Sequence, residues 1–161
     1  MESLKRNLIL RDRNELQKFE RFIEDVCEQQ NVTQEYFGNI FLASMEVVEI
    51  LFSFSDSNVL NFISVQFERS VKGIIFTFVI IRNGEEEMLS PDIVDREIRR
   101  HKLDRELLIA KTLSDEIAIN SDGHGLQLLF HINGISFERS CERVNLLKSF
   151  WSSTTKVIQR G

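Results

Sequence analysis

The sequence contains little glycine and proline, and this scarcity limits the kinds of loop that it can build. Seven glycines and one proline make up about 5% of the 161 residues, whereas average usage is roughly 12%. Glycine lets a backbone approach a phosphate group closely, so the shortage counts against a glycine-rich nucleotide-binding loop. The hydrophobic content of 42% and the charged content of 28% are ordinary globular values, and they exclude disordered, collagen and coiled-coil classes.

Cysteine and histidine are also scarce. The two cysteines, Cys27 and Cys141, are far apart and outside any C-x-x-C motif, which predicts buried thiols in a reducing cytosol. The three histidines, His101, His124 and His131, are scattered and lie in no cluster with metal-ligand spacing. We therefore predict no structural zinc and no other metal site.

Excess positive charge and long apolar runs are absent. The 20 Lys and Arg residues are outnumbered by 25 Asp and Glu residues, and the net charge is −5. An acidic chain is a poor counterion for a phosphate backbone, so nucleic acid is not an expected partner. The longest apolar run, Ile74 to Ile81, is too short to span a bilayer, and the first residues lack the pattern of a secretory signal. These features predict a soluble cytoplasmic protein that does not bind membranes.

Hydrophobic spacing predicts an alternation of strands and helices. Apolar residues at helical spacing predict helices over about 14–30, 33–54 and 103–113. Alternating or continuous apolar runs predict strands over about 7–10, 59–67, 74–81, 116–121 and 126–132. Paired strands with helices packed on one face define an α+β two-layer sandwich with a mixed, mostly antiparallel sheet.

Two segments have a less regular pattern. Residues 85–103 hold Pro91 and a dense run of charges, so we expect a lid-like loop there, with a short helix after Ser90 as the alternative. Apolar residues at helical spacing in 134–161 predict a C-terminal helical extension, packed on its own sheet or supplying a dimer contact. We therefore predict one domain over 1–133, with 134–161 as its extension.

Three stretches carry a resemblance to a known family. They are IFLASMEVV at 40–48, FVIIRNG at 78–84 and DRELLIAKTLSDEI at 104–117. In order and spacing, the chain over roughly 5–133 resembles the GHKL (Bergerat-fold) ATPase superfamily, specifically the small bacterial serine kinases that act as anti-sigma factors. The resemblance implies the Bergerat version of the α+β sandwich, in which the helix of the first stretch carries catalytic residues.

The resemblance places three functional positions on the first two stretches. Glu46 matches the general base, which activates the attacking nucleophile. The Mg²⁺-binding Asn falls on Ile50, whose side chain has no oxygen for a hard cation. The adenine-reading Asp falls on Arg82, whose guanidinium only donates hydrogen bonds. Glu46 lies off the main apolar stripe of its helix, so an ordinary solvent-exposed glutamate is preferred to a remnant base.

The glycine positions of the family are mostly lost. Gly84 retains the first glycine of the adenine-side motif, but the second falls on Glu86. The phosphate-side glycines fall on Asp104 and Glu106. Carboxylates at these two positions would repel the phosphates and lack the conformational freedom of glycine.

These replacements predict a pseudo-ATPase that uses no cofactor: a non-catalytic regulatory module that binds another protein. The resemblance implies a sigma factor or an anti-sigma antagonist as the partner, and it implies a homodimer. Two alternatives stay open. One is a divergent ATP- and Mg²⁺-dependent serine/threonine kinase that uses Glu46 as general base. The other is a pocket remodelled for a different small ligand, with Arg82 as anion anchor.

Overall fold

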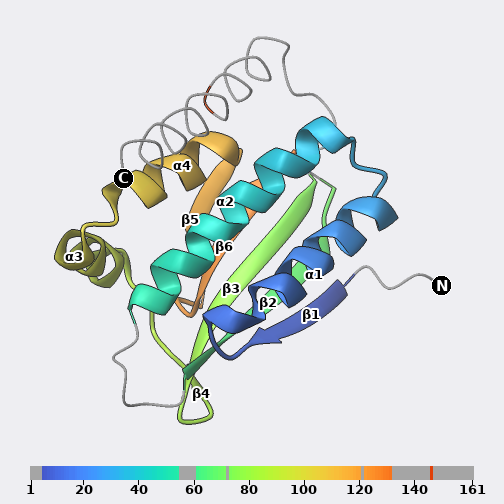
Figure 1. Ribbon diagram of the computed structural model, residues 1–161. Helices are drawn as coiled ribbons and strands as arrows, with labels where there is room; N and C mark the ends of the chain where they lie inside the picture. The colour runs from blue at the N-terminus through green and yellow to red at the C-terminus, as the bar shows by residue number, and fades with distance from the viewer. Residues whose placement is uncertain (1–4, 55–60, 72, 121, 132–145, 147–161) are drawn as a thin grey trace, which may run out of the picture.

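A six-stranded sheet and four α-helices make up the part of the chain that the computed structural model describes, residues 5–54, 61–71, 73–120, 122–131 and 146 (Figure 1). The elements follow one another as β1 (Lys5–Leu10), a 3-10 turn (Arg13–Glu15), α1 (Leu16–Gln29), α2 (Gln34–Ser53), β2 (Asn61–Arg69), β3 (Ile74–Arg82), β4 (Glu85–Glu86), α3 (Pro91–His101), α4 (Asp104–Leu113), β5 (Glu116–Ile119) and β6 (Gly125–Phe130). The α+β class predicted from the sequence is confirmed.

The sheet is built from antiparallel pairs. Its strand order is β1-β2-β3-β6-β5, and the short β4 pairs with the end of β3. All five pairings among the described strands are antiparallel. The expectation of a mixed sheet is therefore wrong for this part of the chain, because the excursion through α3 and α4 returns the chain by a β5–β6 hairpin that lays β6 antiparallel to β3.

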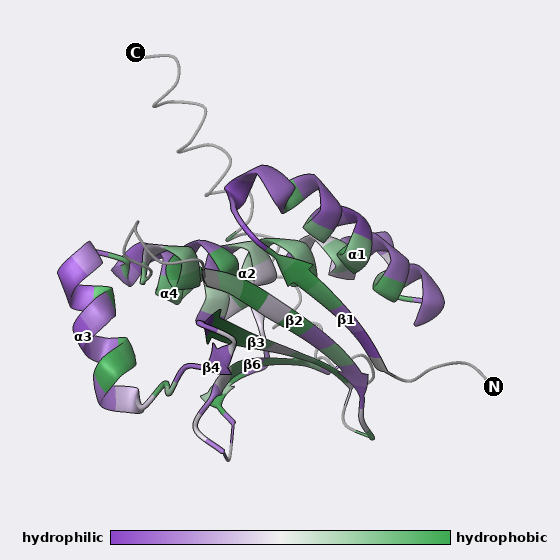
Figure 2. Ribbon diagram, turned by 90° about the horizontal axis from the view of Figure 1, so that it is seen from below, coloured by the Kyte–Doolittle hydropathy of each residue, from purple (hydrophilic) through white to green (hydrophobic). Residues whose placement is uncertain are grey.

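One face of the sheet carries the core. Helices α1, α2 and α4 lie on this face (Figures 1 and 2). Side chains alternate between the two faces of a strand, and the predicted inward set of β2, Ile63, Val65 and Phe67, is buried as expected. In β3 the inward residues are again fully buried and belong to the same core: Ile74, Phe76, Phe78 and Ile80.

Helix α2 runs between α1 and α4 across the middle of the helix layer (Figure 1). Apolar residues occupy much of the circumference of α2. Because α2 lies between α1 and α4, the helix is buried on more than one side, as predicted. Among the described helices, α2 alone is long and apolar enough to cross a membrane by length and composition. The core helix of a soluble protein passes the same test, and 44% of the apolar window of α2 is buried inside the molecule.

The segment 85–103 is not the lid-like loop that we expected. It contains β4 and the eleven-residue helix α3. Ser90 caps α3 by accepting a hydrogen bond from the backbone N–H of Ile93 at 3.2 Å, and Pro91 occupies the first turn, where its missing N–H costs nothing. The chain leaves α3 through Lys102, whose left-handed conformation (φ 55°) ends the helix. The alternative, a helix after Ser90, is confirmed.

The predicted C-terminal helix over 134–161 lies outside the described residues, apart from Leu146, which packs against the main core. Cys141 lies outside them as well. Cys27 is buried on α1, as predicted.

Candidate functional site

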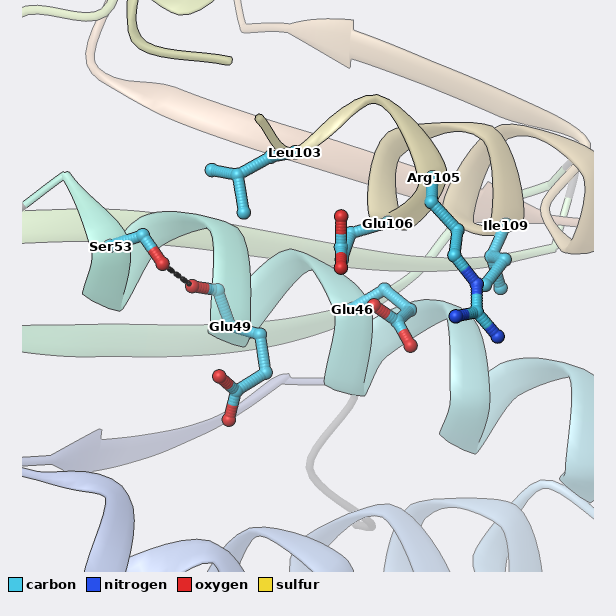
Figure 3. A pocket seen from close by; sticks show the side chains of 7 residues that line it. All are labelled: Glu46, Glu49, Ser53, Leu103, Arg105, Glu106 and Ile109. Carbon is cyan, nitrogen blue, oxygen red and sulfur yellow. Dashed lines mark hydrogen bonds between the residues drawn. The ribbon is translucent and has the colours of Figure 1, made fainter. Parts of the chain in front are cut away.

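A cavity of about 310 Å³ lies between α2 and the N-terminal half of α4 (Figure 3). Glu46, Glu49 and Ser53 line its α2 side, because residues three, four or seven apart share one face of a helix. The other wall contains Leu103 and three residues of α4: Arg105, Glu106 and Ile109. The cavity wall is therefore mostly charged, and Leu103 and Ile109 are its apolar residues.

Glu46 lies in this cavity and is only partly exposed. The prediction of an ordinary solvent-exposed glutamate is wrong, because α4 packs over this side of α2. Burial raises the pKa of the Glu46 carboxyl from 4.5 to about 7, and the nearby carboxylates of Glu106 and Glu49 add to the increase. The Arg105 guanidinium opposes these effects and lowers the pKa. A carboxyl that titrates near neutrality can act chemically as a general base.

Glu106 faces Glu46 from α4 (Figure 3). Its Oε2 atom is buried and has no hydrogen-bond partner within the described part of the chain. A buried acceptor without a donor is costly, so this oxygen is a source of local strain in the interface. Glu106 lies in the first turn of α4, and its side chain is on the side of the helix that faces α2.

Ile50 does not open onto this cavity. Its side chain is 1% exposed and forms a second apolar cluster with Ile98 of α3 and Leu103, the residue that joins α3 to α4. Phe54, Val94 and Leu107 pack around this cluster. Helix α3 is thereby held against α2 and the start of α4.

Arg82 lines a different cavity, of about 220 Å³, at the end of β3. Its guanidinium pairs with the Glu87 carboxylate at 3.2 Å. The remaining lining comes from the end of α2, the segment before α3, and α3 itself: Phe54, Met88, Leu89, Ile93, Arg96 and Glu97. The Glu87 carboxylate offsets the positive charge that Arg82 would need in order to bind an anion.

The other three positions singled out by the resemblance lie on the surface. Asn83 and Gly84 both have positive φ, 54° and 78°, which is the backbone of a tight turn between β3 and β4. Gly84 is thus explained by the turn. Glu86 is exposed on β4, and Asp104 is exposed at the start of α4.

The structure therefore brings Glu46 and Glu106 together and separates them from Arg82, Gly84 and Glu86. Sequence reasoning missed the roles of Glu49, Ser53 and Arg105 in the cavity wall. The spacing of 46, 49 and 53 along one helix face was the available signal for the first two. Among the described residues, no group of three or more His, Cys, Asp or Glu side chains is placed to hold a metal ion.

The fold and the cavities define an α+β protein with an antiparallel sheet and an acidic cleft in its helix layer. No protein-family model matches the chain, and no curated protein matches it in sequence. A relationship to the GHKL superfamily stays a prediction that depends on the three stretches quoted above.

Proposed function

We propose that this protein is a non-catalytic regulatory module that binds another protein, with the Bergerat architecture of the anti-sigma factor serine kinases but without a working nucleotide site. The observation that carries the proposal is the burial of Ile50, at the position of the family's Mg²⁺-binding Asn, in an apolar cluster with Ile98 and Leu103. An apolar cluster at this position offers a Mg²⁺ ion no oxygen ligand.

The charges around the cluster support the same proposal. Glu46, Glu49 and Glu106 line the neighbouring cavity, and only Arg105 contributes a positive charge to its wall. Triphosphate would meet three carboxylates there, at a cost that grows as the site is desolvated. At the end of β3, Arg82 is paired with Glu87, and its guanidinium cannot accept a hydrogen bond from an adenine amino group.

The partner in this proposal is a protein: a sigma factor or an anti-sigma antagonist, in the cytoplasm, with a second copy of the chain forming a homodimer. These elements follow from the resemblance alone. A regulator that catalyses no reaction needs a binding surface on a stable fold. The second apolar cluster stabilises the fold by holding α3 in place.

One observation favours a different function, a divergent serine/threonine kinase. Glu46 is partly buried beside a cavity and its pKa is about 7, which suits a general base near neutral pH. This kinase would bind ATP and Mg²⁺ in the cavity between α2 and α4, whose wall includes Arg105.

Thermal unfolding with Mg²⁺ and ATP or ADP distinguishes the two functions. A nucleotide present at about 100 times its Kd stabilises a protein by about 2.7 kcal/mol, which raises the Tm by several degrees. We expect no change in Tm at millimolar nucleotide. A clear increase, together with ADP release that Glu46→Gln abolishes, would instead establish the kinase.

A further inference from the structure

Two carboxylates about sixty residues apart in the sequence face each other across the α2–α4 interface. Glu46 projects from α2 and Glu106 from α4, and both line the cavity of about 310 Å³ (Figure 3). Like charges that face each other across a partly desolvated cavity repel each other. The interface is least strained when one of the two carboxyl groups carries a proton.

The surroundings decide which of the two takes the proton. Glu106 lies in the first turn of α4, where the helix dipole stabilises negative charge. Glu49, the next acidic residue on α2, is paired with Arg13 at 3.2 Å. Among the described residues, the charged groups that act on Glu46 are Glu106 and Arg105 from α4 and Glu49 from its own helix. Only Arg105 favours a charged Glu46, so Glu46 is the residue that binds the proton.

We propose that Glu46 and Glu106 form a proton-dependent latch between α2 and α4, closed while Glu46 is protonated and loosened when both carboxylates are charged. The cavity is large enough to admit water, so the charged form is accessible without global unfolding. The first turns of α4 would loosen first, because they carry Glu106, whose charge faces Glu46. The latch needs no nucleotide and no partner, and it is independent of the proposed function.

The direction of the effect follows from the raised pKa. A carboxyl whose pKa is about 7 in the closed state and 4.5 when solvated holds its proton more tightly when closed. The stabilisation is fully present below about pH 4.5 and is lost as the pH rises to about 7. Above this range both states are deprotonated and the effect levels off.

The test combines an NMR titration with hydrogen exchange on the full chain. The side-chain carboxyl ¹³C signal of Glu46 should titrate with a midpoint near pH 7. Protection of the α4 amides, corrected for intrinsic exchange, should fall by up to about tenfold per pH unit between pH 5 and 7 and then level off. Protection in α1 should not follow this profile.

Three variants separate the latch from general effects of charge. Glu46→Gln mimics the protonated form and should keep the α4 amides protected up to pH 8. Glu106→Gln removes the facing charge and should move the Glu46 midpoint and the loss of protection to lower pH together. Glu20→Gln, on the exposed side of α1, is the matched control and should behave as the wild type does.

Either of two results would overturn the latch. One is a Glu46 midpoint below pH 5. The other is a pH profile of α4 protection that is the same in the wild type and Glu46→Gln. If Glu46→Gln folds poorly, the joint shift in Glu106→Gln decides, since a merely structural role for Glu106 would not move the Glu46 titration.

Discussion

Gly73 and Gly84 both have a backbone conformation that side chains rarely adopt, but only Gly73 is packed against another strand. At Gly73, with φ 155°, an added Cβ would lie 2.1 Å from the carbonyl oxygen of Phe130. At Gly84, with φ 78°, an added Cβ would meet no atom within 4 Å. The two positions therefore separate the cost of a backbone clash from the cost of an unfavourable φ.

We predict that Gly73→Ala lowers the free energy of unfolding by about 3 kcal/mol or more, because the β3–β6 pair must separate to admit a methyl group. Gly84→Ala is the matched control and should cost about 1 kcal/mol, the penalty for a left-handed residue. Urea denaturation of the two variants measures both values. Equal losses would mean that the contact between Gly73 and Phe130 contributes nothing.

Glu46 shows what a sequence pattern reveals about a single residue. Its position off the main apolar stripe of α2 is visible in the sequence, and by itself this predicts exposure. Its partner Glu106 lies in another helix, and the spacing within α2 contains no information on which helix covers that side. The raised pKa of Glu46 is a consequence of this packing.

At the scale of elements, α3 is the least expected feature. Its sequence, PDIVDREIRRH, is dominated by charge, and only Ile98 is fully buried. The signals at its start were nevertheless present, since Ser90 and Pro91 are a favoured N-cap and first-turn pair. The many charged residues of α3 made the helical pattern hard to recognise. The helix has one narrow apolar side, which packs through Ile98 and Val94 on the Ile50 cluster.

We predict that Ser90→Ala destabilises α3 by about 1 kcal/mol, because the cap to the Ile93 N–H is lost. Thr33→Ala is the control: Thr33 is the N-cap of α2 but makes no side-chain cap hydrogen bond, so its replacement should cost less than about 0.5 kcal/mol. Hydrogen exchange of the amides of α3 and α2 measures the two effects. A larger loss for Thr33→Ala would contradict this account of the start of α3.

At the scale of the whole molecule, one large core joins the helix layer to the sheet. Phe76 on β3 has ring contacts with Phe22 of α1, Phe67 of β2 and Phe130 of β6. Cys27 lies in the same core on α1, with 4% of its surface exposed. Burial raises the pKa of the Cys27 thiol to about 12, so the reactive thiolate is almost absent in the folded protein.

We predict that Cys27 reacts with a thiol reagent at pH 8 only when the core opens. In a Cys141→Ser variant, the labelling rate should increase with urea in parallel with global unfolding. A Cys27→Ser, Cys141→Ser variant that carries Lys18→Cys, at an exposed site on the same helix, is the control and should react at once. Rapid labelling of Cys27 in the absence of urea would show that α1 opens separately from the rest of the core.

The sequence by itself determined the local elements, because hydrophobic periodicity is a property of neighbouring residues and survives without any tertiary contact. It located α1, α2, α4 and every described strand except β4 within a few residues, together with the α+β class. Only the tertiary structure decided that Ile50 meets Ile98 and that Glu46 meets Glu106, since these contacts depend on which helix faces pack together. The burial that raises the pKa of Glu46 therefore exists only once α2 and α4 are side by side.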